Sequence, residues 1–224
     1  MGRRRTLSAL VLLAAGLSAC GSSHASKPKT TATTGAAART CQNVPAPTPR
    51  AAGHLSKPQL RLNPARTYTV RMVTNCGEID IRLGVAQAPK TTASFASLVR
   101  KHFYDGLTFH RIAPGFVIQG GDPTGTGTGG PGYSVIEKPP ADARYTRGVV
   151  AMAKTQTEAP GTSGSQFFIV TAADAQLPPQ YAVVGNVIRG DGVVTRISAI
   201  PIGGSTGEQP QQPVVIERAT LVTG

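Results

Sequence analysis

The sequence has 224 residues and a formal charge of +12 at pH 7, with 23 Lys and Arg residues against 11 Asp and Glu residues. The excess lies near the N-terminus, since residues 21–66 carry seven basic and no acidic residues, whereas residues 67–224 carry 13 basic and 11 acidic residues. A basic stripe interleaved with aromatic side chains, the pattern of nucleic-acid binding proteins, is absent from the sequence. Charge and composition therefore exclude nucleic acid as the expected partner.

Residues 1–19 have the layout of a secretory signal peptide. Three arginines at positions 3–5 give it a basic start, residues 7–17 form a short apolar run, and small residues precede Cys20. The run is too short to cross a bilayer as a helix, and its end resembles the cleavage box of bacterial lipoproteins. This resemblance implies a mature chain that begins at Cys20, carries acyl chains such as palmitate there, and is anchored to the extracytoplasmic face of the cell membrane. The alternative is a secreted protein in which Cys20 has no such role.

Residues 20–66 are rich in Ser, Thr, Ala and Pro and contain almost no bulky apolar residues before Leu55. Such a segment buries too little apolar surface to offset the conformational entropy lost on ordering. We therefore expect a lipidated, disordered and basic tether. Its scattered cations would aid attachment to anionic headgroups.

The chain has three cysteines. If Cys20 is acylated, Cys41 and Cys76 remain as a pair, and an exported protein permits a disulfide between them. Two alternatives stay open: a bridge that fastens the tether to the folded domain, or two free thiols.

Beyond the tether the sequence predicts many short strands and two helices. Alternating apolar residues on both sides of residues 75–77 indicate a β-hairpin. Pro89 opens a helical stretch, because proline is tolerated in the first turn, and apolar residues at helical spacing predict a buried or rim position for His102. A second helix is expected at 193–200 and a last strand at 213–222. Short strands separated by Gly- and Pro-rich loops favour an antiparallel barrel.

Residues 109–122 contain two short strands separated by a Pro-Gly turn. Alternation places Phe109 and Arg111 on one face of the first strand. In the second strand Val117 and Gln119 share a face. A guanidinium and an amide would thus face an apolar patch, and this indicates a function or a partner because arginine is rarely buried unpaired.

This segment resembles the signature of the cyclophilins, a family of peptidyl-prolyl cis-trans isomerases. The resemblance continues in the order typical of the family through residues 148–153, 164–171 and 181–187, and extends over about residues 67–224. It implies a mainly β domain in which a closed antiparallel eight-stranded barrel has a helix over each end. Because side chains fill a barrel of this size, the binding groove is expected on its outer wall. The sequence contains no oligomerisation signal, so we expect a monomer.

Rotation about an X-Pro amide has a barrier of about 18–20 kcal/mol, because resonance is lost in the twisted geometry. No covalent bond forms or breaks, so the reaction needs no nucleophile, metal or cofactor. A contact that is stronger to the twisted amide than to either planar isomer accelerates rotation. On the family pattern Arg111 makes this contact to the prolyl nitrogen, and Gln119 orients Arg111 and the substrate carbonyl.

The resemblance assigns further residues to the groove, which would bind proline-containing polypeptides and assist the folding of exported proteins. The apolar proline pocket is expected to consist of Phe116, Val117, Phe168 and Leu177. Other expected substrate-binding residues are Ala153, Lys154, Gln166 and Tyr181. One alternative makes Arg111 a surface ion-pair former and the phenylalanines ordinary core residues. Another is a non-catalytic module that binds proline-containing segments at the cell envelope.

Three departures from the family pattern fall on the groove, one of which is Tyr181 where eukaryotic members often have His. Gln176 stands where many members carry Trp, and the chain has no Trp, so we expect weak binding of cyclosporin-type ligands. The connection formed by residues 154–161 is longer than usual, and Pro178-Pro179 replaces Asp-Gly. These two changes are expected to alter sequence preference and not the basic activity.

Two other patterns carry no chemistry. Residues 125–130 match the G-x-G-x-x-G spacing of dinucleotide sites, but Pro131-Gly132 follows where that motif requires a helix, so we expect a loop. The four histidines show no metal-ligand spacing, and His110 is expected to be structural.

Overall fold

The computed structural model describes residues 40–224. The predicted signal peptide, the predicted lipidation site Cys20 and the tether as far as residue 39 lie outside the described residues. Within residues 40–224, no helix has both the length and the apolar character needed to cross a membrane.

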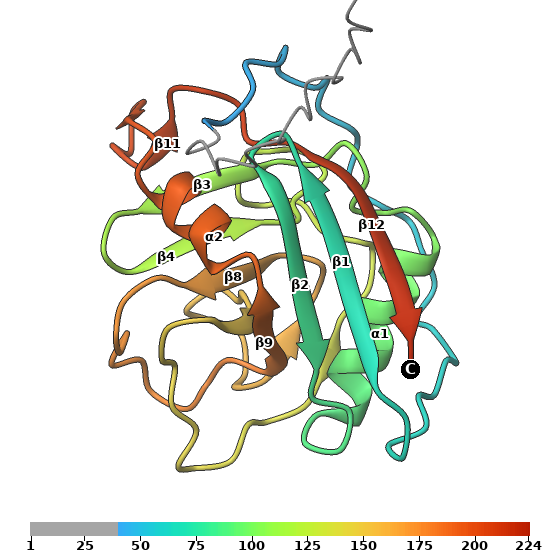
Figure 1. The fold of residues 1–224 in the computed structure, drawn as a ribbon. Helices are drawn as coiled ribbons and strands as arrows, with labels where there is room; N and C mark the ends of the chain where they lie inside the picture. Colours follow the sequence, from blue (N-terminus) through green and yellow to red (C-terminus); the bar gives the residue numbers. More distant parts are fainter. Residues whose placement is uncertain (1–39) are drawn as a thin grey trace, which may run out of the picture. The chain divides into compact units, whose positions relative to one another are not determined.

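An eight-stranded antiparallel sheet forms the body of the domain (Figure 1). The order of its strands is β12-β1-β2-β9-β6-β8-β4-β3. Their bounds along the chain are β1 (Tyr68–Thr74), β2 (Gly77–Leu83), β3 (Phe109–Ala113), β4 (Val117–Gly120), β6 (Val149–Met152), β8 (Phe167–Val170), β9 (Val183–Arg189) and β12 (Ile216–Thr223). Two small pairs lie outside this sheet: β5 (Val135–Ile136) with β7 (Thr162–Ser163), and β10 (Ile202–Gly203) with β11 (Gln209–Pro210). The predicted hairpin is confirmed as β1 and β2, and the predicted last strand as β12.

The sheet curls strongly but does not close into the predicted barrel. Its edge strands β3 and β12 meet only near an isolated bridge between Thr108 and Val215, beside which the Phe109 N–H donates to the carbonyl of Val214 at 2.9 Å. Beyond this crossing β12 pairs with β1, and the free edge of β3 is occupied by the segment leading into β11, where the Ile112 N–H donates to the carbonyl of Glu208 at 2.8 Å. The prediction of a closed barrel was therefore wrong, and the sheet is a half-barrel.

Two helices pack against the sheet, as predicted: α1 (Pro89–Arg100) and α2 (Asp191–Ser198). They contribute buried apolar residues to one large inner cluster, which also contains the inward-facing residues of the strands. His102 is not on the buried face of α1, because the helix ends at Arg100. His102 is exposed, has a positive φ of 54° and pairs with Asp105 through Nδ1 at 3.0 Å.

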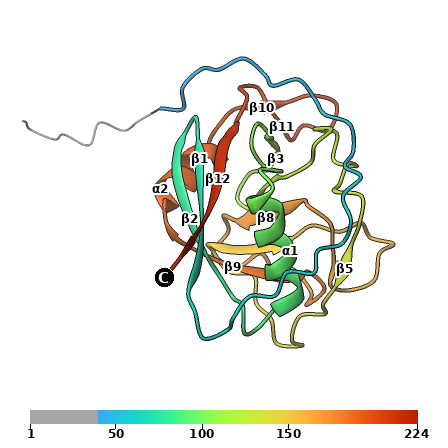
Figure 2. The ribbon, with the colours of Figure 1, turned by 90° about the vertical axis from the view of Figure 1, so that its right-hand side faces the viewer.

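Residues 40–66, which we call the strap, lie against the domain as an extended segment. In Figure 2 the strap is the blue to cyan trace that runs around the domain and crosses in front of α1 before entering β1. The Gly53 N–H donates to the carbonyl of Gly130, and the Leu55 N–H donates to that of Pro131, both at 2.8 Å. Leu55 and two further strap leucines are partly buried against the inner cluster. The prediction of a disordered tether was thus wrong for these residues, because backbone pairing and the leucines supply contacts that composition did not indicate.

A disulfide joins Cys41 at the start of the strap to Cys76 in the β1–β2 turn, with an S–S distance of 2.06 Å. Of the two alternatives that the sequence left open, the structure contains the bridge. Asn75 strengthens the junction, since its side-chain Nδ2 donates to the carbonyls of Gln42 at 2.8 Å and Pro213 at 3.0 Å. The strap is therefore connected to the domain covalently at its first residues and by hydrogen bonds further along.

Candidate active site

Four neighbouring strands contribute one residue each to a row across the outer face of the sheet. In the antiparallel register Arg111 of β3 lies opposite Gln119 of β4. Gln119 in turn lies opposite Phe168 of β8, which lies opposite Ala151 of β6. Residues directly opposite one another project from the same face of a sheet. The row therefore brings a guanidinium, an amide and an aromatic ring together.

A β-bulge at His110 turns Arg111 towards this outer face. The register shifts between Phe109 and Arg111, so that His110 is the additional residue on β3. As a result Phe109 and Ile112 are both fully buried in the inner cluster, whereas Arg111 lies outside it. The prediction that Phe109 and Arg111 share a face was wrong, because strict alternation does not hold across a bulge.

Three polar side chains form a directional hydrogen-bonded chain that begins with two members of this row, Arg111 and Gln119, and continues to Gln166, just before β8. Nη1 of Arg111 donates to Oε1 of Gln119 at 3.2 Å, and Nε2 of Gln119 donates to Oε1 of Gln166 at 3.0 Å. Nε2 of Gln166 donates to the carbonyls of Gly127 and Gly129, both at 2.9 Å. Arginine is a donor only, so it fixes the direction of every bond in the chain. The orientation of Arg111 is thereby connected to the loop at residues 127–129.

Glu208 binds the opposite side of the guanidinium. Its Oε2 accepts from Nε of Arg111 at 2.6 Å, and its Oε1 accepts from Nη2 at 3.0 Å. Bidentate, charge-assisted hydrogen bonds of this kind are stronger and more directional than neutral ones. All three guanidinium nitrogens of Arg111 are therefore bound by Glu208 or Gln119.

A small hollow of about 130 Å³ lies beside Arg111 on the outer face. Nine of the ten residues that the sequence predicted for the groove line it: Arg111, Phe116, Val117, Gln119, Ala153, Lys154, Phe168, Leu177 and Tyr181. The tenth, Gln166, lines the adjoining hollow. Gln176, at the position where many cyclophilins carry Trp, is exposed and does not line either hollow. The structure thus brings all ten predicted residues to one continuous groove.

The apolar wall of the hollow is built from aromatic rings packed edge to face and at a tilt. The ring of Phe168 meets the ring of Tyr181 edge to face, with 5.5 Å between centroids, and Tyr145 packs against both rings. The Tyr145 hydroxyl donates to the carbonyl of Tyr181 at 2.7 Å and accepts from its N–H at 2.9 Å. Burial raises the pKa of Tyr145. Through its two hydrogen bonds Tyr145 holds the backbone of Tyr181 in place from behind the wall.

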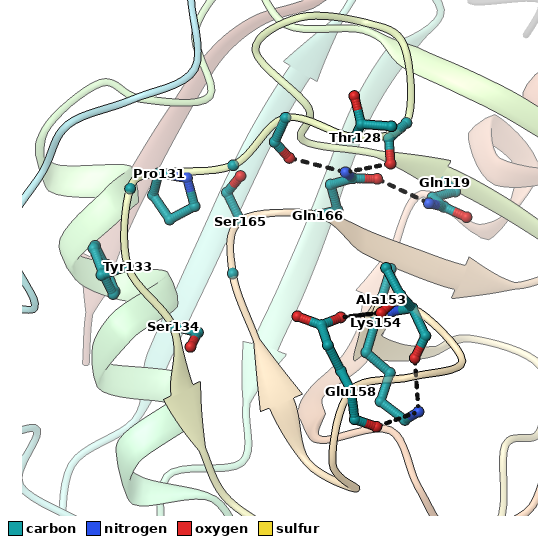
Figure 3. Close-up of a pocket in the computed structure, with 16 residues that line it drawn as sticks. Gln119, Thr128, Pro131, Tyr133, Ser134, Ala153, Lys154, Glu158, Ser165 and Gln166 are labelled. Carbon is teal, nitrogen blue, oxygen red and sulfur yellow. Dashed lines mark hydrogen bonds between the residues drawn. The ribbon is translucent and has the colours of Figure 1, made fainter.

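A larger hollow of about 340 Å³ continues the groove beyond Gln119 (Figure 3). Gln119 and Gln166 lie on one side of it, and Lys154 and Glu158 lie on another. Nζ of Lys154 donates to the carbonyl of Glu158 at 3.1 Å and lies 5.6 Å from the centroid of the Tyr181 ring. The same lysine thus borders both hollows and links the 154–161 connection to the aromatic wall.

A buried aspartate organises the glycine-rich loop at the rim of this larger hollow. Asp122 is only 1% exposed, and its Oδ1 accepts from the N–H of Thr124 at 2.8 Å and from its hydroxyl at 2.9 Å. Burial disfavours ionisation of Asp122, but the hydrogen bonds from Thr124 and from the N–H groups of Gly129 and Gly127 outweigh it, so the pKa is lowered. The carboxylate therefore stays ionised and holds the loop whose carbonyls accept hydrogen bonds from Nε2 of Gln166. No helix follows this loop, as predicted.

Tyr145 and Glu208 were not predicted from the sequence. Tyr145 lies in a polar loop segment with no periodic pattern, and Glu208 lies 97 residues after Arg111 in a segment with no regular alternation. No sequence signal connects either residue with the groove. Among residues 40–224, no group of three or more His, Cys, Asp or Glu side chains is placed to hold a metal ion.

Comparison with known proteins agrees with this geometry. Residues 69–221 match the family model described as cyclophilin type peptidyl-prolyl cis-trans isomerase/CLD. The chain is 38% identical over 177 residues to peptidyl-prolyl cis-trans isomerase A of Mycobacterium tuberculosis. This match covers 71% of this chain and 94% of the relative. It is also 38% identical over 168 residues to peptidyl-prolyl cis-trans isomerase B of Streptomyces anulatus, covering 67% of this chain and 94% of the relative.

A solved structure shares the fold. It is the Cryptosporidium parvum cyclophilin type peptidyl-prolyl cis-trans isomerase, crystallised in the presence of the dipeptide Ala-Pro. The match has a TM-score of 0.64 and 32% sequence identity, and covers 70% of this chain and 99% of the other. With the family model matched over most of the chain and an outer groove formed around Arg111 and Phe168, this chain belongs to the cyclophilin-type peptidyl-prolyl cis-trans isomerases.

Proposed function

We propose that Arg111 accelerates isomerisation by donating a hydrogen bond to the prolyl nitrogen of the twisted X-Pro amide. In the planar amide that nitrogen is conjugated with the carbonyl and is a poor acceptor. As the bond twists, the nitrogen regains a basic lone pair, so a donor held beside it gains energy mainly in the transition state. The observation that carries the proposal is the placement of the Arg111 guanidinium on the same 130 Å³ hollow as Phe116 and Phe168.

The size and lining of this hollow suit a prolyl ring. Pockets for drug-sized molecules have volumes of about 300–1,000 Å³, so a hollow of about 130 Å³ suits a single side chain. Val117 and Phe168 are almost fully buried, and Leu177 and Tyr181 are partly buried, which gives apolar contact to a ring and reduces the water around Arg111. Exclusion of water strengthens a hydrogen bond to a developing charge.

The second hollow gives the substrate a direction. It shares Gln119, Ala153 and Lys154 with the proline hollow. We propose that the residues before the proline lie here, with their backbone groups against Ala153 and Lys154. The connection at 154–161 then borders these residues, which makes it the source of any preference for the residue before proline.

The clients that we propose are exported proteins, and the site of action is the extracytoplasmic face of the cell membrane. The support is the sequence: a basic start, an apolar run and small residues before Cys20. The Cys41–Cys76 disulfide is compatible with an oxidising compartment. Acyl chains on Cys20 would anchor the domain, with the basic residues after it adding weak electrostatic attraction.

Exchange spectroscopy on a proline-containing peptide tests the catalytic proposal. The wild-type protein is expected to give cis-trans exchange cross-peaks that depend on its concentration. Arg111→Ala should lower the rate by roughly 10²-fold or more, which is the usual cost of removing one preorganised donor. Arg111→Lys should also lose most activity, because a point-charge ammonium does not reproduce the planar fork. Full activity in Arg111→Ala would refute the role of Arg111 while leaving the family assignment intact.

Labelling with radioactive palmitate tests the membrane proposal in cells that express the full chain. The wild type should incorporate label and sediment with membranes, whereas Cys20→Ala should do neither. Cys41→Ala is the matched control and should be labelled like the wild type. An unlabelled wild-type protein in the soluble fraction would exclude the lipid anchor.

A further inference from the structure

We propose that Glu208 is a positioning residue for Arg111, which fixes the guanidinium in the orientation that catalysis requires. This inference rests on the proposed role of Arg111 and extends it to a residue from a distant part of the chain. The contact is direct: Nε and Nη2 of Arg111 donate to the two carboxylate oxygens of Glu208 at 2.6 and 3.0 Å.

The geometry leaves a defined set of donors for substrate. Glu208 occupies the edge of the fork formed by Nε and Nη2, and Gln119 accepts one hydrogen from Nη1 at 3.2 Å. A guanidinium has five N–H groups. Two of them, one on Nη1 and one on Nη2, remain after these three bonds. One free donor therefore remains on each of the two terminal nitrogens of the guanidinium.

Glu208 is itself held in place by the main chain. Its carbonyl accepts from the N–H of Ile112 at 2.8 Å, which is the residue next to Arg111 on β3. Glu208 is the last residue of the connection between β10 and β11. These two strands pair antiparallel, with Gly203 opposite Gln209 and Ile202 opposite Pro210. Figure 1 shows β11 beside β3 at the same edge of the domain. The main chain of Glu208 is thus bound to the residue next to Arg111, which places its carboxylate beside the guanidinium.

The exposure of the pair argues that the contact has a measurable effect. The side chains of Arg111 and Glu208 are 33% and 34% exposed, respectively. The fully exposed ion pairs of most protein surfaces contribute little, because solvent screens them and their side chains remain flexible. A half-buried, bidentate pair with a third bond to Gln119 restricts a long side chain to one orientation.

Two effects of Glu208 oppose each other. Its negative charge partly offsets the positive charge of Arg111, which weakens attraction to the prolyl lone pair. Its hydrogen bonds align the fork, and a hydrogen bond weakens steeply once its angle is poor. We expect alignment to dominate, because the lone pair of the twisted amide points in one direction and a misaligned donor does not reach it.

The test measures kcat and KM for a proline peptide by NMR exchange with the full chain. Glu208→Ala should lower kcat about 10-fold and change KM less than about twofold, because alignment matters chiefly in the twisted state. Glu208→Gln keeps one acceptor and the side-chain shape, so it should lower kcat only about threefold. It also provides a second variant if Glu208→Ala does not fold. The unfolding midpoint of each variant is recorded, so that a loss of folded protein is distinguished from a loss of rate.

A spectroscopic readout separates positioning from general stability. The Nε–H resonance of Arg111, assigned by its loss in Arg111→Lys, should exchange slowly with water in the wild type and rapidly in Glu208→Ala. The matched control is Asp191→Asn, which alters another bidentate pair, with Arg147 at 3.1 Å for both contacts. This variant should leave kcat and the Arg111 resonance unchanged.

The outcomes distinguish the two proposals. If Arg111→Ala is inactive but Glu208→Ala keeps the wild-type kcat, the positioning role is wrong and the role of Arg111 stands. A higher kcat in Glu208→Ala or Glu208→Gln also overturns the inference, since the charge of Glu208 would then be inhibitory. If Arg111→Ala itself retains full activity, the proposed role of Arg111 fails first.

Discussion

Oε1 of Gln119 accepts a hydrogen bond from Nη1 of Arg111 at 3.2 Å, directly across the β3–β4 pair. The same amide donates through Nε2 to Oε1 of Gln166. Because Arg111 is only a donor, the amide has no freedom to reverse without losing both bonds. Gln119 therefore transmits the orientation of Arg111 to the hollow in which we place the residues before the proline.

Replacement of Gln119 separates these two contacts. Gln119→Glu keeps an acceptor for Arg111. Its ionised carboxylate is only an acceptor, so the hydrogen bond that Gln119 donates to Gln166 is lost. We expect kcat/KM to fall roughly 2–10-fold, which corresponds to the loss of one neutral hydrogen bond of about 0.5–1.5 kcal/mol. The measurement is NMR exchange on peptides that differ in the residue before proline, for which the variant should show altered selectivity.

Gln119→Ala removes both contacts and should lower kcat/KM further than Gln119→Glu does. The control is Gln59→Ala, an exposed glutamine of the strap, which should behave as the wild type. Equal activities for Gln119→Glu and wild type across all peptides would show that the connection to Gln166 has no catalytic consequence.

The sequence predicted the members of the groove better than it predicted their geometry. Four ordered segments of resemblance were sufficient to name the ten residues, because the family pattern assigns each of them by position. The phase of β3 was not predictable from alternation, since His110 forms a bulge between the paired positions Phe109 and Arg111. Periodicity describes a regular strand and contains no information about a single inserted residue.

Contacts made by irregular segments were the other part that the sequence did not reveal. Glu208 and Tyr145 act through tertiary placement, and their segments have no periodic pattern. The prediction for the strap was wrong for a related reason. Its composition is poor in apolar residues, but Leu55, Leu60 and Leu62 contact the inner cluster, which is formed by other segments. A composition argument treats the segment as isolated and so underestimates the surface it buries.

The glycine-rich loop offers a steric test with a built-in control. A Cβ on Gly129 would overlap with Oδ1 of Asp122 and lie 2.8 Å from Cγ2 of Thr124. Gly129→Ala should therefore displace Asp122 or the loop, at a cost of about 1–3 kcal/mol in the free energy of unfolding. Because the Gly129 carbonyl accepts a hydrogen bond from Nε2 of Gln166, activity should fall as well. Urea unfolding and peptide exchange measure the two effects.

Gly130→Ala is the matched control for this loop. A Cβ on Gly130 meets no atom within 4 Å, and its φ is not in the left-handed region. The variant should stay within about 0.5 kcal/mol of the wild type, as is usual for surface substitutions. If both alanine variants are equally stable and active, Asp122 does not fix the loop in the way described.

Loss of the disulfide should destabilise the domain substantially. The Cys41–Cys76 bridge spans a sequence separation of 35 residues, for which the chain-entropy model gives about 3–4 kcal/mol. Cys41→Ser should therefore lower the Tm by roughly 6–16 °C, and the amides of Gly53 and Leu55 should exchange faster with solvent. Cys41 is the better position to change, since Cys76 is only 2% exposed and serine there would bury a hydroxyl.

Reductant provides the control for the disulfide prediction. A thiol reductant should lower the Tm of the wild type by a similar amount and leave the Tm of Cys41→Ser unchanged. Identical Tm values for wild type and variant under oxidising conditions would mean that the strap contributes no stability through the bridge.

His110, the additional residue of the bulge, is largely buried. Neither of its ring nitrogens has a hydrogen-bond partner among the described residues. Burial lowers the pKa of His110 below the ordinary value of 6.5, the nearby charge of Asp122 acts in the opposite direction, and that of Arg111 lowers the pKa further. The folded protein therefore contains neutral imidazole at a pH where the unfolded chain is already partly protonated.

This difference predicts an acid-sensitive stability. Between the folded pKa and about 6.5 the unfolded state binds more protons, so the free energy of unfolding rises with pH, by at most about 1.4 kcal/mol per pH unit for one group. The contribution is complete above pH 6.5 and is lost as the pH falls towards the folded pKa of His110. Urea unfolding from pH 4.5 to 8 should show a smaller slope in His110→Phe than in the wild type. His102→Phe, which changes an exposed histidine, controls for the substitution itself. Parallel slopes for wild type and His110→Phe would show that protonation of His110 does not limit stability in acid.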